Sequence, residues 1–212
     1  MALPSAAELP PPREPGAPYR VCLVCLGNIC RSPMAEVALR AALVEAGLDG
    51  AVIVDSAGTG DWHVGGPMDP GARSALARCG YDRSAHRARQ FQASWLAERD
   101  LVLAMDAHNL ADLRRMAGAR GRWMPGAQDA GIPDAGRIRL FGEVGGLTET
   151  GDGDIPDPWG GDADEFGSVL DLLRAVAPVI AGRLARLLEP SGPSLGGPSV
   201  SGPSLGGPSV PA

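Results

Sequence analysis

The chain has 212 residues, 44% of them hydrophobic, and its 25 acidic and 19 basic residues leave a formal net charge of −6. This negative balance argues against nucleic acid as the main partner, because phosphate backbones are bound through basic patches. The longest apolar run is too short to cross a bilayer as a helix, so we expect no membrane contact.

Apolar runs and helical patterns alternate along the middle of the chain. They predict strands over residues 19–24, 51–54, 101–104 and 138–141, and helices over 33–46, 69–79, 107–117 and 162–188. Pro178 can kink the last helix, and Gly47 and Gly80 stand where helices commonly end. The alternation predicts an α/β fold with a four-stranded parallel sheet, helices on both faces and ligand sites at the carboxyl ends of the strands.

The two ends of the chain have the composition of disordered segments. Residues 1–18 are rich in proline, alanine and glutamate, and the decapeptide Ser-Gly-Pro-Ser-Leu-Gly-Gly-Pro-Ser-Val occurs at 191–200 and again at 201–210. Neither composition can build a hydrophobic core. We therefore expect a disordered segment over 1–18, one folded domain over 19–189, and a disordered tail over 190–212 whose repeat is a duplicated linker.

A loop between the first strand and the first helix carries the chemistry. Residues 25–32, the phosphate loop, read Cys-Leu-Gly-Asn-Ile-Cys-Arg-Ser, with Arg31 six residues after Cys25. A loop of this length can curl around a tetrahedral phosphate, with its NH groups and the helix N-terminus directed at the anion. The same dipoles and the Arg31 guanidinium favour a Cys25 thiolate, and the planar guanidinium can hold two phosphate oxygens. The pattern predicts a phosphate site that contains its own nucleophile.

The other residues of the loop suit this task. We expect Gly27 and Asn28 to supply positive φ angles, and Ser32 to cap the helix and offer its hydroxyl to the thiolate. The phosphate-binding positions besides Cys25 and Arg31 are Leu26, Gly27, Asn28, Ile29, Cys30 and Ser32. A redox or zinc pair of Cys22 with Cys25 is disfavoured, because strand residues three apart point to opposite faces.

Residues 24–33 resemble the active-site signature of low-molecular-weight protein tyrosine phosphatases. The likeness covers about 19–189 and includes residues 54–59, 61–65, 85–90, 105–106 and 157–158. It implies a flavodoxin-like, three-layer αβα fold of the phosphotyrosine phosphatase I type. It also implies hydrolysis of phosphotyrosine in proteins through a phosphocysteine intermediate, with no cofactor and no metal. Many members carry two tyrosines where this chain has Trp159 and Gly160, so it lacks those phosphorylation sites.

A carboxyl group is needed to protonate the leaving oxygen and then to activate the attacking water. The residues alone leave Asp152, Asp154 and Asp157 open, since all three lie in one proline-flanked stretch. The resemblance selects Asp157, which matches the family's general acid.

The resemblance also implies supporting roles. Ser56 and His86 match positions that hold the loop asparagine in a strained conformation behind the phosphate loop. Trp62 and His63 match the positions that face the phosphotyrosine ring. Trp159 would form the opposite wall, with ordinary packing as its alternative role.

Other activities of the same fold stay as alternatives. Protein-arginine phosphatases carry threonine where this chain has Ile29. Thioredoxin-coupled arsenate reductases need a further cysteine pair, and outside the loop this chain has only Cys22 and Cys79. We also expect that Cys30 captures oxidised Cys25 as a disulfide.

The expected partners are phosphotyrosine-containing proteins, bound by a monomer or weak dimer. Few cysteines, and no basic segment followed by an apolar one at the start, indicate the reducing cytoplasm. Export by a route that uses no signal peptide stays open.

Overall fold

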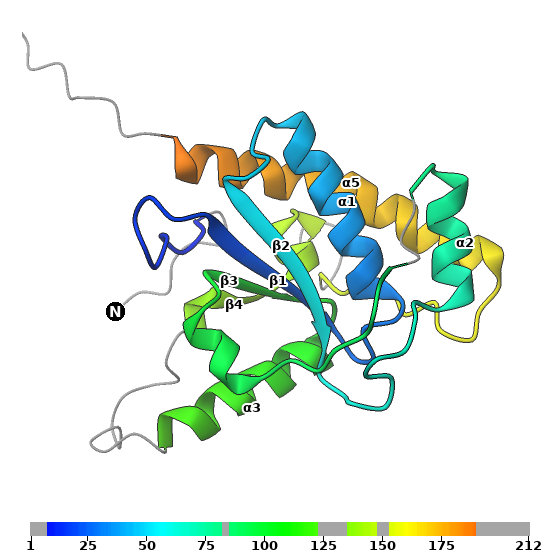
Figure 1. The fold of residues 1–212 in the computed structure, drawn as a ribbon, viewed down its shortest axis with the longest axis horizontal. Coiled ribbons are helices and arrows are strands. Elements are labelled where there is room, and N and C mark those ends of the chain that lie inside the picture. The colour runs from blue at the N-terminus through cyan, green and yellow to red at the C-terminus, as the bar shows by residue number, and fades with distance from the viewer. Residues whose placement is uncertain (1–7, 82–84, 123–134, 148–152, 190–212) are drawn as a thin grey trace, which may run out of the picture.

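A four-stranded parallel sheet forms the centre of the molecule. The computed structural model describes residues 8–81, 85–122, 135–147 and 153–189. The strands are β1 (Tyr19–Cys25), β2 (Val52–Gly58), β3 (Leu101–Ala104) and β4 (Ile138–Leu140), in the spatial order β2-β1-β3-β4 (Figure 1). All three pairings are parallel, so the carboxyl ends of the strands share one edge of the sheet.

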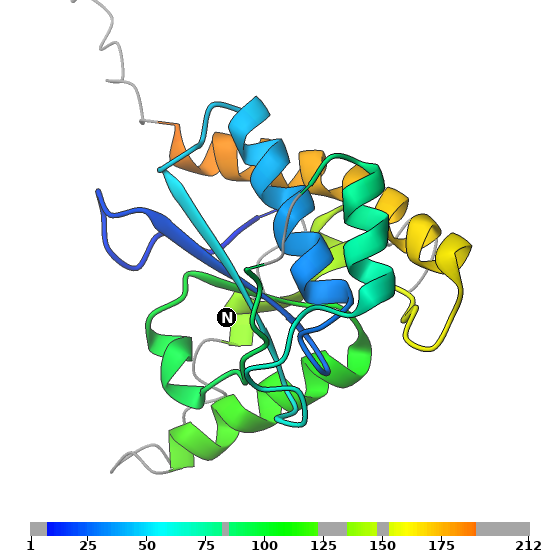
Figure 2. The ribbon, with the colours of Figure 1, turned by 45° about the vertical axis from the view of Figure 1, so that its right-hand side comes forward.

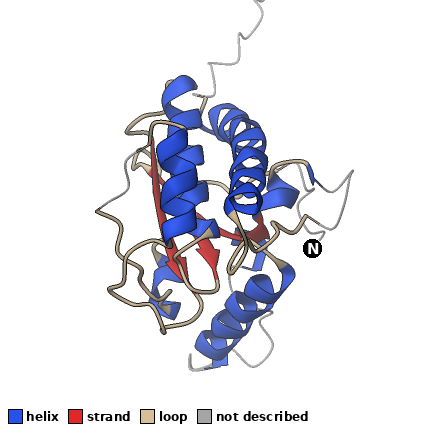
Figure 3. Cartoon of the chain, turned by 90° about the vertical axis from the view of Figure 1, so that its right-hand side faces the viewer, coloured by secondary structure: helices blue, strands red, loops and turns tan. Residues whose placement is uncertain are grey.

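Helices cover both faces of this sheet (Figures 1, 2 and 3). On one face lie α1 (Arg31–Glu45), α2 (Pro70–Arg78) and α5 (Ala163–Leu188), which pack against one another. On the other face lie α3 (Ala107–Arg122) and the 3₁₀ helix η1 (Ala93–Ala97). Short elements flank β4, namely the 3₁₀ helix η2 (Ala135–Arg137) before it and α4 (Phe141–Val144) after it. The predicted α/β fold with a four-stranded parallel sheet is confirmed.

The hydrophobic core has one part on each face. Val21 and Leu23 of β1 point into the cluster with α1, α2 and α5, whereas Cys22 and Val24 point into the cluster with α3. A central parallel strand is buried on both sides, which explains the unbroken apolar run. Cys22 and Cys25 accordingly belong to opposite faces.

Several predicted boundaries differ from the structure. The strand predicted to end at residue 54 continues to Gly58, because Asp55 and Ser56 find polar partners and need not be apolar. Phe141 begins α4 instead of ending β4. Helix α5 continues through Pro178, and Asp162 with Glu165 forms a capping box at its start.

The expectation of disorder over residues 1–18 is wrong for residues 8–18, which lie against the domain. Leu9 is buried in the core, and Arg13 donates from its backbone N to Asp100 Oδ1 at 2.6 Å. Tyr19 Oη donates to the carbonyl of Pro10 at 2.9 Å, and burial raises the pKa of Tyr19. Proline carbonyls can still accept hydrogen bonds, and prolines lose little backbone entropy on ordering.

The remaining predictions about the termini concern residues 1–7 and 190–212, which lie outside the described residues. None of the helices in the described part of the chain combines the length and apolarity that a membrane crossing requires.

Candidate active site

The phosphate loop joins β1 to α1 at the carboxyl edge of the sheet. Cys25 is the last residue of β1 and Arg31 is the first of α1, and both side chains are buried. The Cys25 sulfur accepts from the backbone N of Asn28 at 3.3 Å and lies 3.1 Å from Ser32 Oγ. The sulfur therefore sits among donors at the N-terminus of a helix, which is a setting that stabilises a thiolate.

Asn28 has the one positive φ, 54°, among non-glycine residues in the described ranges. Its side chain is fully buried: Nδ2 donates to Ser32 Oγ at 2.9 Å, and Oδ1 accepts from the backbone N of Arg89 at 3.0 Å. Asparagine tolerates the left-handed region, and these contacts hold it there. This unusual backbone directs the Asn28 N–H at the Cys25 sulfur.

Two expectations about the loop are wrong. Ser32 does not cap α1, because the N-cap is Cys30 without a side-chain hydrogen bond, while Ser32 lies inside the helix and faces Cys25. Gly27 does not have a positive φ. Its lack of a side chain matters for space, since a Cβ there would lie 2.9 Å from His63 Cδ2.

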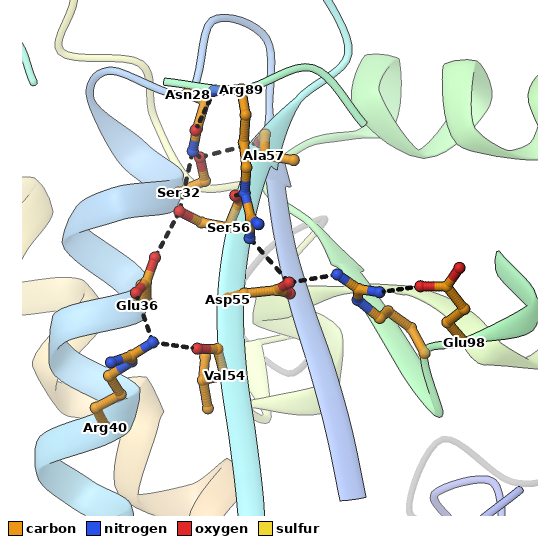
Figure 4. A network of polar contacts seen from close by, with 11 residues as sticks. Asn28, Ser32, Glu36, Arg40, Val54, Asp55, Ser56, Ala57, Arg89 and Glu98 are labelled. Carbon is orange, nitrogen blue, oxygen red and sulfur yellow. Dashed lines mark hydrogen bonds and ion pairs between the residues drawn. The ribbon is translucent and has the colours of Figure 1, made fainter. Parts of the chain in front are cut away.

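The two residues expected behind the loop both contact Asn28. Asn28 Nδ2 donates to Ser56 Oγ at 3.0 Å, and His86 Nε2 lies 2.8 Å from the Asn28 carbonyl oxygen. Two residues that were not predicted extend these contacts: Glu36 accepts from Ser56 Oγ, and the backbone N of Arg89 donates to Asn28 Oδ1 (Figure 4). Glu36 gives no sequence signal of its own, because a glutamate on a helix is usually a surface residue.

Arg31 is held by two carboxylates at the rim of the loop. Its guanidinium donates to Asp106 Oδ2 at 2.5 Å and to Asp157 Oδ2 at 2.6 Å, and also to the carbonyl of Ile155 at 3.2 Å. Burial by itself lowers the pKa of Arg31, but the hydrogen bond with Asp106 and the charges of Asp157 and Cys25 outweigh it and raise that pKa. Arg31 is thus a permanent cation directed at the site, and the role of Asp106 was not predicted.

An open cavity of about 340 Å³ lies above the Cys25 sulfur. Its walls bring together most of the predicted site residues, namely Cys25, Leu26, Gly27, Ile29, Cys30, Arg31, Trp62, His63, Asp157 and Trp159. Trp62 and Trp159 are 71% and 68% exposed, so neither indole is packed in a core. The cavity is therefore a slot with a charged floor and aromatic sides.

The structure distinguishes two of the three candidate aspartates, Asp154 and Asp157. Asp157 lines the cavity, and its Oδ1 accepts from the backbone N of Trp159 at 3.2 Å. Asp154 Oδ1 instead accepts from the backbone N of Ala107 at 2.9 Å, at the start of α3. Asp152 lies outside the described residues.

The other cysteines differ from Cys25 in their surroundings. Burial, and to a lesser extent the charge of Asp69, raises the pKa of the Cys30 thiol. Burial beside Asp55 likewise raises the pKa of Cys22. Cys79 is exposed at the end of α2. Cys25 alone has both the cavity and the donors that a nucleophile requires.

Comparison with known proteins agrees with this geometry. The sequence model described as "Low molecular weight phosphotyrosine protein phosphatase" matches residues 20–188. The chain belongs to this family. A low molecular weight protein-tyrosine-phosphatase of Streptomyces coelicolor is 44% identical over 171 residues, which cover 81% of this chain and 94% of that protein.

Solved structures of the low molecular weight phosphatases share the fold. YfkJ from Bacillus subtilis has a TM-score of 0.65 at 32% identity, covering 82% of this chain and 98% of that one. YwlE, an arginine phosphatase solved as a mutant with a phosphorylated active-site serine, has a TM-score of 0.64 at 27% identity, covering 80% and 99%. Family membership makes this chain a hydrolase, and it implies phosphorylated proteins as substrates.

Proposed function

We propose that this chain hydrolyses phosphotyrosine in proteins, with Cys25 as the nucleophile and a phosphocysteine as the intermediate. The observation that supports it most is the Cys25 sulfur, which lies between the Asn28 N–H and the Ser32 hydroxyl at the floor of a cavity that also holds Arg31 and Asp157. Nucleophile, anion-binding groups and acid thus surround one space.

In the first step the phosphoryl group of the substrate enters the phosphate loop. The loop N–H groups and the Arg31 guanidinium bind its oxygens, and Arg31 exchanges its contact with Asp157 for one with the dianion. The thiolate of Cys25 forms an S–P bond while the P–O bond to the tyrosine ring breaks. Asp157, in its protonated form, gives its proton to the leaving phenolate oxygen.

In the second step the same groups act in the opposite sense. Asp157, now a carboxylate, takes a proton from a water molecule as its oxygen attacks phosphorus. The S–P bond breaks, inorganic phosphate leaves and the Cys25 thiolate is restored. Ser32 Oγ, 3.1 Å from the sulfur, can donate to the thiolate as it departs.

The aromatic sides of the cavity favour phosphotyrosine as the substrate. Trp62 and Trp159 extend from the rim, so a long phosphorylated side chain gains aromatic contact that a short phosphoserine cannot reach. His63 lies against Gly27, which keeps this wall close to the phosphate loop. Ile29 at the cavity wall favours the tyrosine type over the arginine type.

The substrate class can be tested in one side-by-side assay. Peptides carrying phosphotyrosine, phosphoserine or phosphoarginine, and arsenate with thioredoxin, are given to the same protein with a chelator present. We expect turnover of phosphotyrosine alone, and none with the Cys25→Ser protein, which lacks the thiolate. Preferential release of phosphate from phosphoarginine, or reduction of arsenate, would replace the proposed function.

The chemistry of the nucleophile bears on the compartment in which the enzyme works. A thiolate that must stay reduced suits a reducing compartment, so we place this activity in the cytoplasm, in a monomer or weak dimer. Phosphotyrosine-containing proteins are the proposed partners, and we assign no nucleic acid and no metal to the site.

A further inference from the structure

A buried carboxylate stands behind the phosphate loop. Glu36 on α1 is 6% exposed, accepts from Ser56 Oγ at 2.7 Å through one oxygen, and lies 3.0 Å from Arg40 through the other (Figure 4). Burying a carboxylate costs free energy unless the group is paired and hydrogen-bonded, as Glu36 is, and Glu36 does not line the cavity. We infer that Glu36 is a positioning residue, which sets the direction of a chain of hydrogen bonds from Ser56 to the Cys25 sulfur.

The chain of hydrogen bonds begins at Ser56, which has a single hydroxyl hydrogen. An ionised carboxylate has no hydrogen to offer, so Ser56 must donate its own to Glu36. The Ser56 oxygen is then left only to accept. Its other neighbour is Asn28 Nδ2, at 3.0 Å, which is a donor.

The side-chain amide of Asn28 is therefore oriented from both ends. Ser56 requires the NH₂ group on its side, and the backbone N–H of Arg89, which can only donate, requires the carbonyl oxygen on the other, at 3.0 Å. The second hydrogen of the NH₂ group goes to Ser32 Oγ at 2.9 Å. Asn28 thus passes the direction set at Ser56 on to Ser32.

Ser32 accepts from Asn28, so its own hydrogen is available to one of two acceptors. These are the Cys25 sulfur at 3.1 Å and the Ala57 carbonyl at 3.2 Å. A thiolate is charged and accepts the stronger hydrogen bond. The sulfur then has two donors: the Asn28 backbone N–H at 3.3 Å, and the Ser32 hydroxyl, whose direction follows from the acceptor oxygen that Glu36 offers to Ser56.

Removing the Glu36 carboxylate takes away the acceptor that holds the Ser56 hydroxyl. In Glu36→Leu the buried hydroxyl turns to find another partner, and Asn28 loses one of the contacts that keep its φ at 54°. The donors at the sulfur then lose their alignment. Glu36→Gln keeps an oxygen of the same geometry, so it should rescue the effect.

Two readouts separate positioning from a loss of folding. The first is the rate at which iodoacetate alkylates Cys25 at pH 6, which reports the thiolate without any turnover, and the second is kcat/KM on a phosphotyrosine peptide. We expect Glu36→Leu to lower both by about tenfold, and Glu36→Gln by no more than about threefold. Glu143→Leu is the matched control, because it breaks the i,i+4 ion pair with Arg139, which belongs to β4 and α4 instead of the phosphate loop.

A double-mutant cycle tests whether Glu36 acts through Ser56. If it does, Glu36→Leu has little further effect on alkylation in a Ser56→Ala background. Effects that multiply in full, or a folded Glu36→Leu protein with the wild-type alkylation rate, would overturn the inference. Should Glu36→Leu fail to fold, NMR of the wild type decides: slow solvent exchange of the Ser56 hydroxyl hydrogen, which is bonded to Glu36, supports the inference, and fast exchange refutes it.

The inference rests on the proposed function only for the turnover readout. A wild-type protein without phosphatase activity would overturn that function, whereas the alkylation rates and the exchange of the Ser56 hydroxyl would still judge the role of Glu36.

Discussion

Gly58 at the end of β2 offers a sharp test of how the phosphate loop is supported. A Cβ added there would lie 2.6 Å from the carbonyl oxygen of Leu26 and 3.0 Å from the carbonyl carbon of Gly27. These are backbone atoms and cannot turn aside. Gly58 itself is tied on both sides, since its N donates to the Arg89 carbonyl at 2.9 Å and its carbonyl accepts from Phe91 N at 2.7 Å.

The size of the effect of Gly58→Ala follows from this geometry. Relief of the overlap requires the loop to move by roughly half an ångström, and overpacking of this kind costs about 1–3 kcal/mol. The lower entropy of the unfolded alanine chain offsets about 0.4–1 kcal/mol. We therefore expect the free energy of unfolding to fall by about 1–2 kcal/mol, and kcat/KM by about tenfold, because a 1 Å misplacement costs about 100-fold.

Gly60→Ala is the matched control, because Gly60 lies two residues beyond Gly58, just after the end of β2. A Cβ at Gly60 would overlap the ring of Trp62 at Cζ3, but this ring is largely exposed and can rotate. Stability should change by less than about 0.5 kcal/mol, while KM for a phosphotyrosine peptide rises because the aromatic wall has moved.

Both proteins can be compared by urea unfolding and by steady-state kinetics on a phosphotyrosine peptide. Our reasoning is refuted if Gly58→Ala unfolds and turns over like the wild type. It is also refuted if Gly60→Ala loses as much stability as Gly58→Ala, because the contrast depends on backbone atoms yielding less than an exposed side chain.

Three further perturbations address the chemistry and the cysteines. Asp157→Ala should slow phenyl phosphate hydrolysis by about 100-fold or more, and p-nitrophenyl phosphate far less, because nitrophenolate leaves unprotonated; equal losses on both would place the acid elsewhere. Burial raises the pKa of the Cys22 thiol above its value in the unfolded chain, about 8.5. The contribution of the protonated thiol to the free energy of unfolding is therefore fully present below that pH and is lost as pH rises. Measured by denaturant unfolding between pH 8 and 10, the free energy of unfolding should fall less steeply in Cys22→Ala than in the wild type, by up to about 1.4 kcal/mol per pH unit. Parallel slopes for the two proteins would contradict this. Peroxide inactivation should be reversed by dithiothreitol in the wild type and less fully in Cys30→Ser, because a sulfenic acid on Cys25 condenses with the Cys30 thiol and releases water; full recovery of the variant would exclude that pairing.

Arg31 shows how far sequence reasoning reached into the site. Its spacing from Cys25 predicted a cation at the rim of the phosphate loop, and its guanidinium lines the cavity. Nothing in the local sequence indicated that Asp106, at the carboxyl end of β3, would hold it at 2.5 Å. The two residues meet because β3 pairs with β1 in parallel, so that their carboxyl ends coincide.

The amino-terminal segment shows the opposite limit. Its composition predicted disorder over residues 1–18, yet residues 8–18 are bound by groups far along the chain, such as Asp100 and Arg137. Composition describes whether a segment can build a core of its own. It does not reveal a partner surface that the rest of the domain supplies.

The sequence by itself determined the elements and the phosphate loop, because strand and helix periodicity and the consecutive residues 25–32 act over short distances along the chain. Beyond Ser56 and His86, which the family resemblance implied, only the tertiary structure decided which residues surround that loop: Gly58 from β2, Arg89 from the segment after α2, and Asp106 beside Arg31. These contacts join residues tens of positions apart, and they form only when parallel pairing brings the carboxyl ends of the strands to one edge. Until that edge forms, nothing distinguishes these residues from others of the same type in the sequence.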